Sequence, residues 1–258
     1  MENQNVQKIL IGVLSLAAFA ALWELLAIYV NNSFFLPRFS SVFMAFIDIV
    51  PTAVFLTDVT TSLYHFSIGF FFALLVGIPI GMMMGWFPVL DKALSPIVEI
   101  FRPIPPLAWI PFAIIWLKLT PQAAGFIIFM GMVFPIIINT YSGFKNVPKI
   151  YVEAAKVLGS VSNLRLIRTV AVPAASPMIL SGIKTAMGVG WMCLAAAEMF
   201  GVSNSGIGYK IWFFYGLQAM DYVVVYMLVL GFIGLLLDFV FRHFVQNRIL
   251  KWRKGTVV

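Results

Sequence analysis

Long apolar runs dominate this sequence and constrain its fold more than any other feature. Only 10% of the 258 residues are charged and 62% are hydrophobic, whereas an ordinary soluble domain carries about 25% charged residues. This composition excludes a soluble enzyme, and it is the reverse of the composition that keeps a chain disordered. Helices of about 20 apolar residues cross a bilayer, whereas β-barrels show only weak alternating segments. The sequence therefore predicts an all-α polytopic membrane protein.

Six apolar segments qualify as membrane-spanning helices. Their expected bounds are Ile9–Val30, Ser62–Trp86, Leu107–Leu119, Ala123–Tyr141, Pro177–Phe200 and Tyr222–Phe241. The first run exceeds the roughly 7–15 apolar residues of a secretory signal peptide, so we expect it to be retained as a helix. The third is short, and Pro103, Pro105, Pro106 and Pro111 stand at or near its start. Because proline lacks an amide donor, this segment should begin as a broken or tilted helix.

The positive charges indicate how these helices are oriented, because Lys and Arg favour cytoplasmic connections. Most of them follow the second, fourth and sixth segments: Lys92, Arg102, Lys145, Lys149, Lys156, Arg165, Arg168, Arg242, Arg248, Lys251, Arg253 and Lys254. The other connections hold only Arg38, Lys118 and Lys210. Both termini are therefore expected in the cytoplasm, and the net charge of +7 is explained by topology in membrane lipid, with no nucleic acid as a partner.

We expect three parts in the chain. Residues 1–61 form an N-terminal helix and an extracytoplasmic connection, residues 62–244 a transmembrane core with a cytoplasmic loop at 145–175, and residues 245–258 a basic cytoplasmic tail. The second segment carries a small residue at every fourth position: Gly69, Ala73, Gly77, Gly81 and Gly85. Such a stripe predicts close helix packing, either within the chain or between two copies of it.

The sequence provides no support for catalysis or for nucleotide binding. It lacks the phosphate-binding pattern G-x-x-x-x-G-K-[ST], and the nearest segment, Gly182 to Thr185, has no adjacent Gly and Lys. His65 and His243 are the only histidines and Cys193 is the only cysteine, so neither a metal-binding pattern nor a disulfide within the chain is available. We expect no catalytic, metal or cofactor-binding residue, and interfacial or packing roles for both histidines.

Ionisable residues inside membrane spans are costly and are therefore candidates for function. The apolar segments contain four: Glu24, Lys184, Glu198 and Asp238. Glu198 shares a helix face with Met187, Trp191 and Ala195, which precede it at helical spacing. This face either lines a translocation pathway, to which Arg102 would also belong, or packs on a neighbouring helix.

The loop after the fourth segment predicts a short amphipathic helix between Pro148 and Gly159, residues that suit the start and the end of a helix. Ile150, Ala154, Val157 and Leu158 form its apolar stripe, and Lys149, Glu153 and Lys156 form its charged side. The small Ala154 and Ala155 would permit close approach by a partner, and Gly159 would permit a sharp turn. From these properties alone, a solvated loop helix is equally compatible.

These residues resemble a known family. Glu153-Ala154-Ala155-x-x-x-Gly159, followed by a return to an apolar helix at Pro173, is similar to the signature loop of the membrane subunits of ATP-binding-cassette (ABC) importers. Residues 96–111, 197–209 and 234–238, with the basic end around Trp252, resemble the nitrate/sulfonate/taurine/bicarbonate branch. The resemblance covers nearly the whole chain and implies a type I ABC importer permease fold.

The resemblance implies function and partners as well. The chain would be the permease subunit of an ATP-driven importer in the cell membrane, for a small anion or a small polar organic solute. Its partners would be two copies of a separate ATPase, which bind ATP and Mg, a second permease copy in a homodimer and an extracytoplasmic solute-binding protein. Glu153, Ala154, Ala155 and Gly159 would couple it to the ATPase.

Two other classes of protein remain as alternatives. An ion-coupled secondary transporter would need a coupling-ion site in mid-membrane, often within an internal repeat. A membrane scaffold would not need the amphipathic loop helix.

The chain departs from the family pattern at one place. Pro173 follows Gly159 by fourteen positions, one more than is usual. A helical insertion would rotate the following residues by about 100°, so we expect the extra residue to bulge at the turn near Ser160–Ser162.

Overall fold

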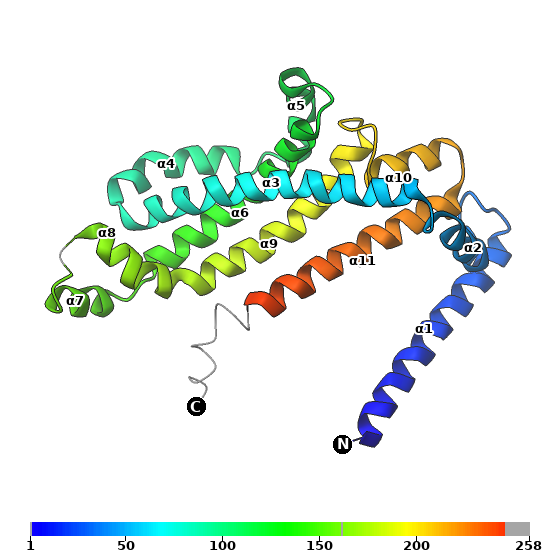
Figure 1. Cartoon of the computed structure of the whole chain (residues 1–258), viewed down its shortest axis with the longest axis horizontal. Helices are drawn as coiled ribbons and strands as arrows, with labels where there is room; N and C mark the ends of the chain where they lie inside the picture. Colours follow the sequence, from blue (N-terminus) through cyan, green and yellow to red (C-terminus); the bar gives the residue numbers. More distant parts are fainter. Residues whose placement is uncertain (1, 161, 246–258) are drawn as a thin grey trace.

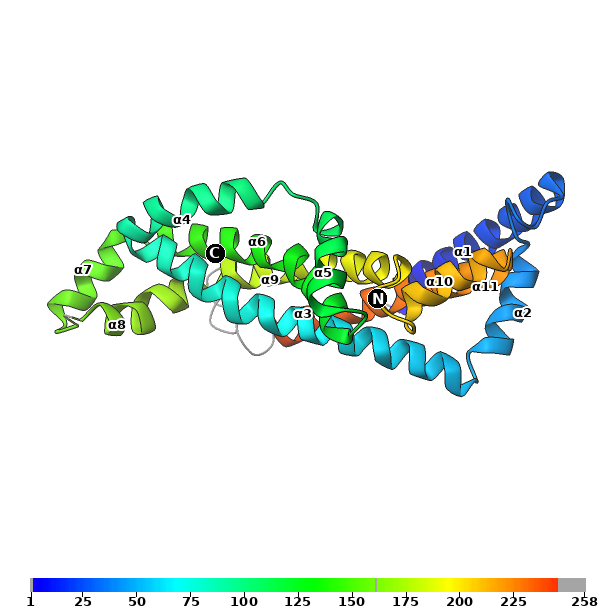
Figure 2. The same cartoon turned by 90° about the horizontal axis from the view of Figure 1, so that it is seen from above.

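A computed structural model describes residues 2–160 and 162–245, and these residues form helices joined by short connections. The helices are α1 Glu2–Val30, α2 Phe39–Ile49, α3 Ala53–Trp86, α4 Pro88–Phe101, α5 Ile110–Leu117, α6 Pro121–Lys145, α7 Lys149–Val157, α8 Asn163–Leu166, α9 Val172–Met199, α10 Ile207–Gly216 and α11 Met220–Phe244. The molecule is elongated, with α7 and α8 at one end and α2 and α10 at the other (Figures 1 and 2). Except for Val245, the expected basic tail lies outside the described residues.

Five of the described helical segments are long and apolar enough to cross a membrane. They are Leu10–Val30, Ala53–Trp86, Pro121–Lys145, Asn163–Met199 and Met220–Phe244. The sixth candidate is a broken pair, Pro88–Phe101 and Pro106–Leu117, whose two parts meet at an angle of 87°. The described helices thus provide five crossings, or six if the bent pair counts as one span, and the break expected at the proline-rich run is confirmed.

Helix α3 begins nine positions before the expected bound at Ser62. The side chain of Thr52 caps it by accepting a hydrogen bond from the backbone N–H of Phe55 at 3.2 Å. The residues between carry polar side chains, including Asp58, which an apolar criterion rejects. Helices α2, α4 and α10 were not expected either; they have 11, 14 and 10 residues and are too short to span a bilayer alone.

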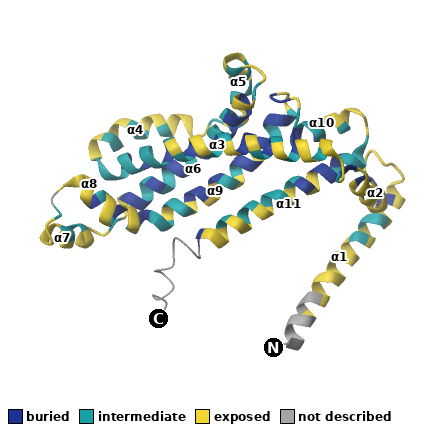
Figure 3. Cartoon of the chain, in the orientation of Figure 1, coloured by how far each residue is buried: buried dark blue, intermediate teal, exposed yellow. Residues whose placement is uncertain are grey.

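Helix α6 forms the centre of the core, between α3 and α9 (Figure 3). Apolar side chains of all three helices meet there: Phe66, Ala73, Ile128, Met132, Ile136, Ala186, Trp191 and Leu194 are buried in one cluster. By contrast, most of the described side chains of α1 are exposed. In a membrane-spanning chain such an apolar exposed surface faces lipid or another subunit.

The stripe of small residues on α3 faces α6 of the same chain. A methyl group added at Gly69 would lie 2.5 Å from Cβ of Ile128, and one at Gly81 would lie 2.5 Å from the carbonyl oxygen of Ile137. A methyl group at Gly77 or Gly85 would likewise lie within 3.0 Å of a side-chain atom of α6, and Ala73 is fully buried. In this structure the small residues of α3 therefore pack on α6 of the same chain.

We expect Gly81→Val to destabilise the protein by about 3 kcal/mol, because overpacking would force the backbones of α3 and α6 apart. Thermal unfolding of the purified protein, followed by gel filtration after heating, measures this effect. Gly231→Val is the matched control, since a side chain at Gly231 of α11 meets no atom within 4 Å. Equal melting of the two variants would show that α3 and α6 are not in close contact.

The connection from α8 to α9 contains a π-helical turn at Ile167–Ala171, just before Pro173. A π-helical turn holds one residue more per hydrogen-bonded ring than an α-helical turn. It therefore offers a physical account of the extra residue between Gly159 and Pro173, further along the chain than expected. The expected bulge near Ser160–Ser162 includes residue 161, which lies outside the described residues.

Candidate functional site

Helix α7 lies at one end of the molecule (Figure 1), and several of its apolar side chains are exposed. Ile150, Val157 and Leu158 are 68%, 87% and 86% exposed. Ala154 is exposed between them, whereas Ala155 is half-buried on another side of the helix. Glu153 lies at the edge, on the charged side. The sequence expectation treated Ala154 and Ala155 as one contact, but they point in different directions.

Gly159 ends α7 in a Schellman motif. Its N–H donates to the carbonyl of Lys156 at 3.0 Å, and the N–H of Ser160 donates to the carbonyl of Ala155 at 2.9 Å. Gly159 has a φ of +89°, which glycine adopts without the strain that a side chain would add. The residue expected to turn the chain therefore does so, and it fixes the direction in which α7 projects.

The face of α9 that includes Met187, Trp191 and Glu198 packs on neighbouring helices. The indole Nε1–H of Trp191 donates to the carbonyl of Leu230 on α11 at 2.9 Å. Met187 packs against the core cluster around Phe66. Of the two alternatives for this face, the structure has the packed one, and these three residues do not lie with Arg102.

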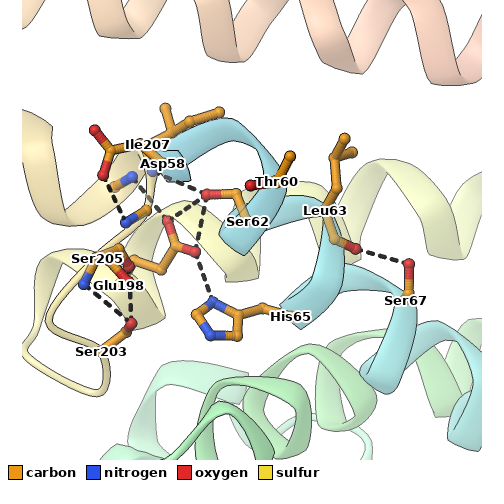
Figure 4. Close-up of polar contacts among 12 residues, drawn as sticks. Asp58, Thr60, Ser62, Leu63, His65, Ser67, Glu198, Ser203, Ser205 and Ile207 are labelled. Carbon is orange, nitrogen blue, oxygen red and sulfur yellow. Dashed lines mark hydrogen bonds and ion pairs between the residues drawn. The ribbon is translucent and has the colours of Figure 1, made fainter. Parts of the chain in front are cut away.

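Glu198 is the centre of a buried polar cluster between α3, α9 and α10 (Figure 4). Its side chain has no exposed surface. Ser62 Oγ lies 2.9 Å from both carboxylate oxygens, and His65 Nδ1 lies 2.8 Å from Oε1. The backbone N–H of Gly208 donates to Oε2 at 2.9 Å. All three donors are themselves buried, so they depend on this carboxylate for a partner.

Asp58 forms a second part of the same cluster, and it is 2% exposed. It accepts hydrogen bonds from the hydroxyl of Tyr226 on α11 at 2.9 Å and from the N–H of Gly206 at 3.3 Å. The N–H of Ile207 donates to Ser62 Oγ at 2.8 Å. Three successive N–H groups at the start of α10 are thus satisfied by side chains of α3 and α9, and two carboxylates face the positive end of that helix. The cluster joins four helices.

Gly206 is required at this position. Its φ is +122°, and a methyl group there would lie 2.5 Å from the carboxylate of Glu198. The described residues contain no group of three or more His, Cys, Asp or Glu side chains that could hold a metal ion. With its hydrogen bonds already made within the chain, the cluster is built to fix helices.

The remaining ionisable candidates are paired. Glu24 on α1 accepts hydrogen bonds from the N–H and the hydroxyl of Ser40, which begins α2. Asp238 on α11 lies 3.6 Å from Nζ of Lys184 and 2.6 Å from the guanidinium of Arg242. These contacts connect helices or stabilise one of them, and Lys184 is therefore not a free cation.

Arg102 lies at the bend of the broken helix pair, directly after α4. It lines a cavity of about 370 Å³ together with Asn139 of α6 and Thr185 of α9. The sequence indicated Arg102 but neither Asn139 nor Thr185, because nothing in their spacing connects them to the proline-rich run.

Asp58 and Ser62 were also missed, although a signal was present. Asp58, Ser62 and His65 are spaced by four and three residues, so they share one helix face. A polar face at the start of an otherwise apolar helix predicts a buried polar partner. The expected start of the helix at Ser62 left Asp58 outside it.

Comparison with known proteins identifies the class to which this fold belongs. Residues 77–249 match the family model described as "Binding-protein-dependent transport system inner membrane component". A putative ABC transporter permease protein of Methanocaldococcus jannaschii is 42% identical over 254 residues, which cover 97% of this chain and 94% of the relative. The chain therefore belongs to this family of ABC transporter permeases.

Two further relatives are named as permeases of transport systems, and one solved transporter structure is similar. The bicarbonate transport system permease protein CmpB of Synechocystis sp. is 38% identical over 69% of this chain and 63% of its own length. The taurine transport system permease protein TauC of Escherichia coli is 33% identical over 74% of this chain and 68% of its own length. A chain of the MetNI methionine ABC transporter has the same fold, with a TM-score of 0.64 at 20% identity, over 75% of this chain and 95% of that one.

The protein is thus a multi-pass inner-membrane permease component of a binding-protein-dependent ABC transporter. It is the non-catalytic membrane subunit, and its class implies an ATPase and a solute-binding protein as partners.

Proposed function

We propose that this chain is the permease of an importer for a small anion or a small polar organic solute, and that α7 couples it to the ATPase. The relatives named for bicarbonate and taurine transport support this substrate class. ATP and Mg are bound and used on the partner, and the chain contributes the pathway and the contact through which energy enters.

The observation that carries this proposal is the exposed apolar face of α7. Ile150, Ala154, Val157 and Leu158 form a surface with no partner among the described residues, at the end of the molecule opposite α10. Burial of that much apolar side chain on a partner is favourable by about 25 cal/mol per Å². The Schellman motif at Gly159 stabilises the C-terminal end of α7, so the helix can stay folded when it docks on the ATPase.

The orientation follows from the same proposal. Lys145, Lys149, Lys156, Arg165 and Arg168 surround α7 in the sequence, which supports a cytoplasmic location for this end. Both termini would then be cytoplasmic, and α2 and α10 would face the solute-binding protein. Closure of two ATPases would bring two docked α7 helices together and convert the pathway between two permease copies from one access state to the other.

Stoichiometry tests the assembly. Native mass spectrometry of the complex purified with its ATPase should show two copies of this chain and two of the ATPase. A complex with one copy of this chain and two ATPases would contradict the homodimer. A complex that assembles equally well after deletion of residues 149–158 would contradict α7 as the docking element.

A further inference from the structure

The cavity beside Arg102 lies at mid-depth in the bundle. Helix α4 begins where α6 ends, since Asp91 near its start lies 3.0 Å from Nζ of Lys145. From there α4 runs back along α3, with Leu94 and Val98 packed on the cluster that includes Met84 and Val133. Its 14 residues rise about 21 Å at 1.5 Å per residue. Arg102, which follows α4, thus lies about 21 Å from the α7 end of the bundle, and not in a cytoplasmic connection as the distribution of positive charges predicted.

The other polar residues of the cavity lie on α6 and α9. Thr185 is thirteen positions into α9, about 20 Å from its start. Asn139 lies closer to the end of α6, with Phe134 and Gly131 of the same helix lining the cavity above it. A volume of about 370 Å³ falls in the usual range of small-molecule sites, about 300–1,000 Å³. The cavity can therefore hold a small solute.

Arg102 is exposed in this chain, and the acidic residue nearest to it in the sequence, Glu99 on α4, forms no ion pair with it in the described part of the chain. Within the described part of the chain the Arg102 side chain has no hydrogen bond or ion pair, and it is the only charged residue that lines the cavity. A guanidinium at this depth is costly unless it faces a water-filled cavity or binds an anion. Such a cation is the usual device by which a pore selects anions.

Asn139 of α6 adds a donor to the lining of the cavity. Its Nδ2 donates one hydrogen to the carbonyl of Pro135 at 2.9 Å, and the second amide hydrogen has no acceptor among the described residues. Thr185 donates its hydroxyl proton to the carbonyl of Ser181 at 3.1 Å, so it contributes a polar surface to the lining but no free donor. As far as the structure describes it, the lining thus offers the guanidinium of Arg102 and one amide hydrogen of Asn139 as donors, and no carboxylate.

The buried cluster removes the main objection to an anion. Glu198, on the face that was one candidate for the pathway, has no exposed surface and bonds to Ser62, His65 and Gly208. Lys184 lies 3.6 Å from Asp238 and does not line the cavity, so among the described residues Arg102 is the charged group that faces it.

We propose that this cavity is an anion-binding site on the translocation pathway, in which the guanidinium of Arg102 and the amide of Asn139 hold the acidic group of the solute. The proposal rests on the proposed function and adds a selective site within the membrane subunit itself. Oxyanions such as carboxylate, sulfonate or bicarbonate groups match the planar fork of an arginine.

A cysteine reporter tests the field in the cavity without knowledge of the solute. The background is Cys193→Ser, which removes the only native thiol, and the reporter is Thr185→Cys in the full transporter complex. Two methanethiosulfonate reagents of similar size are compared, one with a sulfonate and one with a trimethylammonium group. The cysteine thiolate forms a disulfide with the reagent and methanesulfinate leaves, so only the reagent's charge differs between the two reactions.

We expect the anionic reagent to react about tenfold faster than the cationic one, after division by their rates with a free thiol, because both reagents carry unit charge past Arg102. Arg102→Gln should bring this ratio close to one, and Arg102→Lys should preserve it. Ser33→Cys, in the exposed connection after α1, is the matched control, and its ratio should not respond to Arg102→Gln.

Two results would overturn the proposal. One is a Thr185→Cys ratio that stays the same when Arg102→Gln is added to the reporter background. The other is a Thr185→Cys thiol that neither reagent reaches while Ser33→Cys reacts. Neither result affects the docking of α7, which is measured separately by ATP hydrolysis, so failure of this site and failure of the proposed function are distinguishable.

Discussion

Ala154→Asp should abolish the stimulation of ATP hydrolysis by the loaded solute-binding protein, while the chain still inserts and folds. Ala154 is exposed at the centre of the apolar face of α7, so an aspartate there does not disturb the fold of the chain itself. Docking would bury its carboxylate without a partner, at a cost of several kcal/mol. We expect at least a hundredfold loss of affinity for the ATPase. The measurement is the rate of ATP hydrolysis by the complex reconstituted in lipid, with and without the loaded solute-binding protein.

Lys149→Asp is the control for this variant. It introduces the same carboxylate into the same helix, on the charged side and in the first turn, where a negative charge is favourable. Most of the stimulated hydrolysis should remain. If Ala154→Asp hydrolyses ATP like the unmodified complex, α7 does not couple the two subunits. Ala155→Asp is less informative, because Ala155 is half-buried within the chain.

Glu198→Ala should destabilise the permease by at least about 3 kcal/mol. The substitution leaves the Ser62 hydroxyl, the His65 ring N–H and the Gly208 N–H without an acceptor, and each buried donor without a partner costs about 1–3 kcal/mol. It also opens a cavity where the side chain was. The measurement is the fraction of monodisperse protein after heating in detergent, over a range of temperatures.

Glu198→Gln distinguishes the effect of losing the carboxylate from the effect of losing side-chain volume. Glutamine fills the same space, but its amide group would face one of the donors, so an intermediate loss of about 1–2 kcal/mol is expected. Glu99→Ala on α4, where the side chain is exposed, should change stability by no more than about 0.5 kcal/mol. Equal stability of the Glu198→Ala variant and the unmodified protein would contradict a buried, structural Glu198.

Much of the fold follows from apolar run length, and the limits of that criterion are visible in α3. It placed the helix from Ser62 to Trp86 and revealed the small-residue stripe, but it could not say that Gly81 meets α6 and not another copy. It also excluded Thr52–Thr61, because Asp58 and four threonines interrupt the apolar residues there, and so missed Asp58. Contacts such as Ser62 to Glu198 join residues 136 positions apart, a separation at which local periodicity carries no information.

The two candidate sites differ in how far the sequence alone predicts them. Helix α7 was predictable almost residue by residue, since Pro148, the apolar stripe and Gly159 are local signals of start, face and end. The partial burial of Ala155 was not predictable, because it depends on how the helix packs on the rest of the chain. The cavity brings Arg102, Asn139 and Thr185 together only through the fold.

Solute uptake into proteoliposomes tests the central claim most directly. Vesicles containing this chain with its ATPase should accumulate solute delivered by the solute-binding protein only when ATP is supplied on the ATPase side, and Ala154→Asp should stop it. The chain alone should give no accumulation with an imposed proton or sodium gradient. Uptake by the chain alone, driven by either gradient, would identify an ion-coupled transporter and contradict the account.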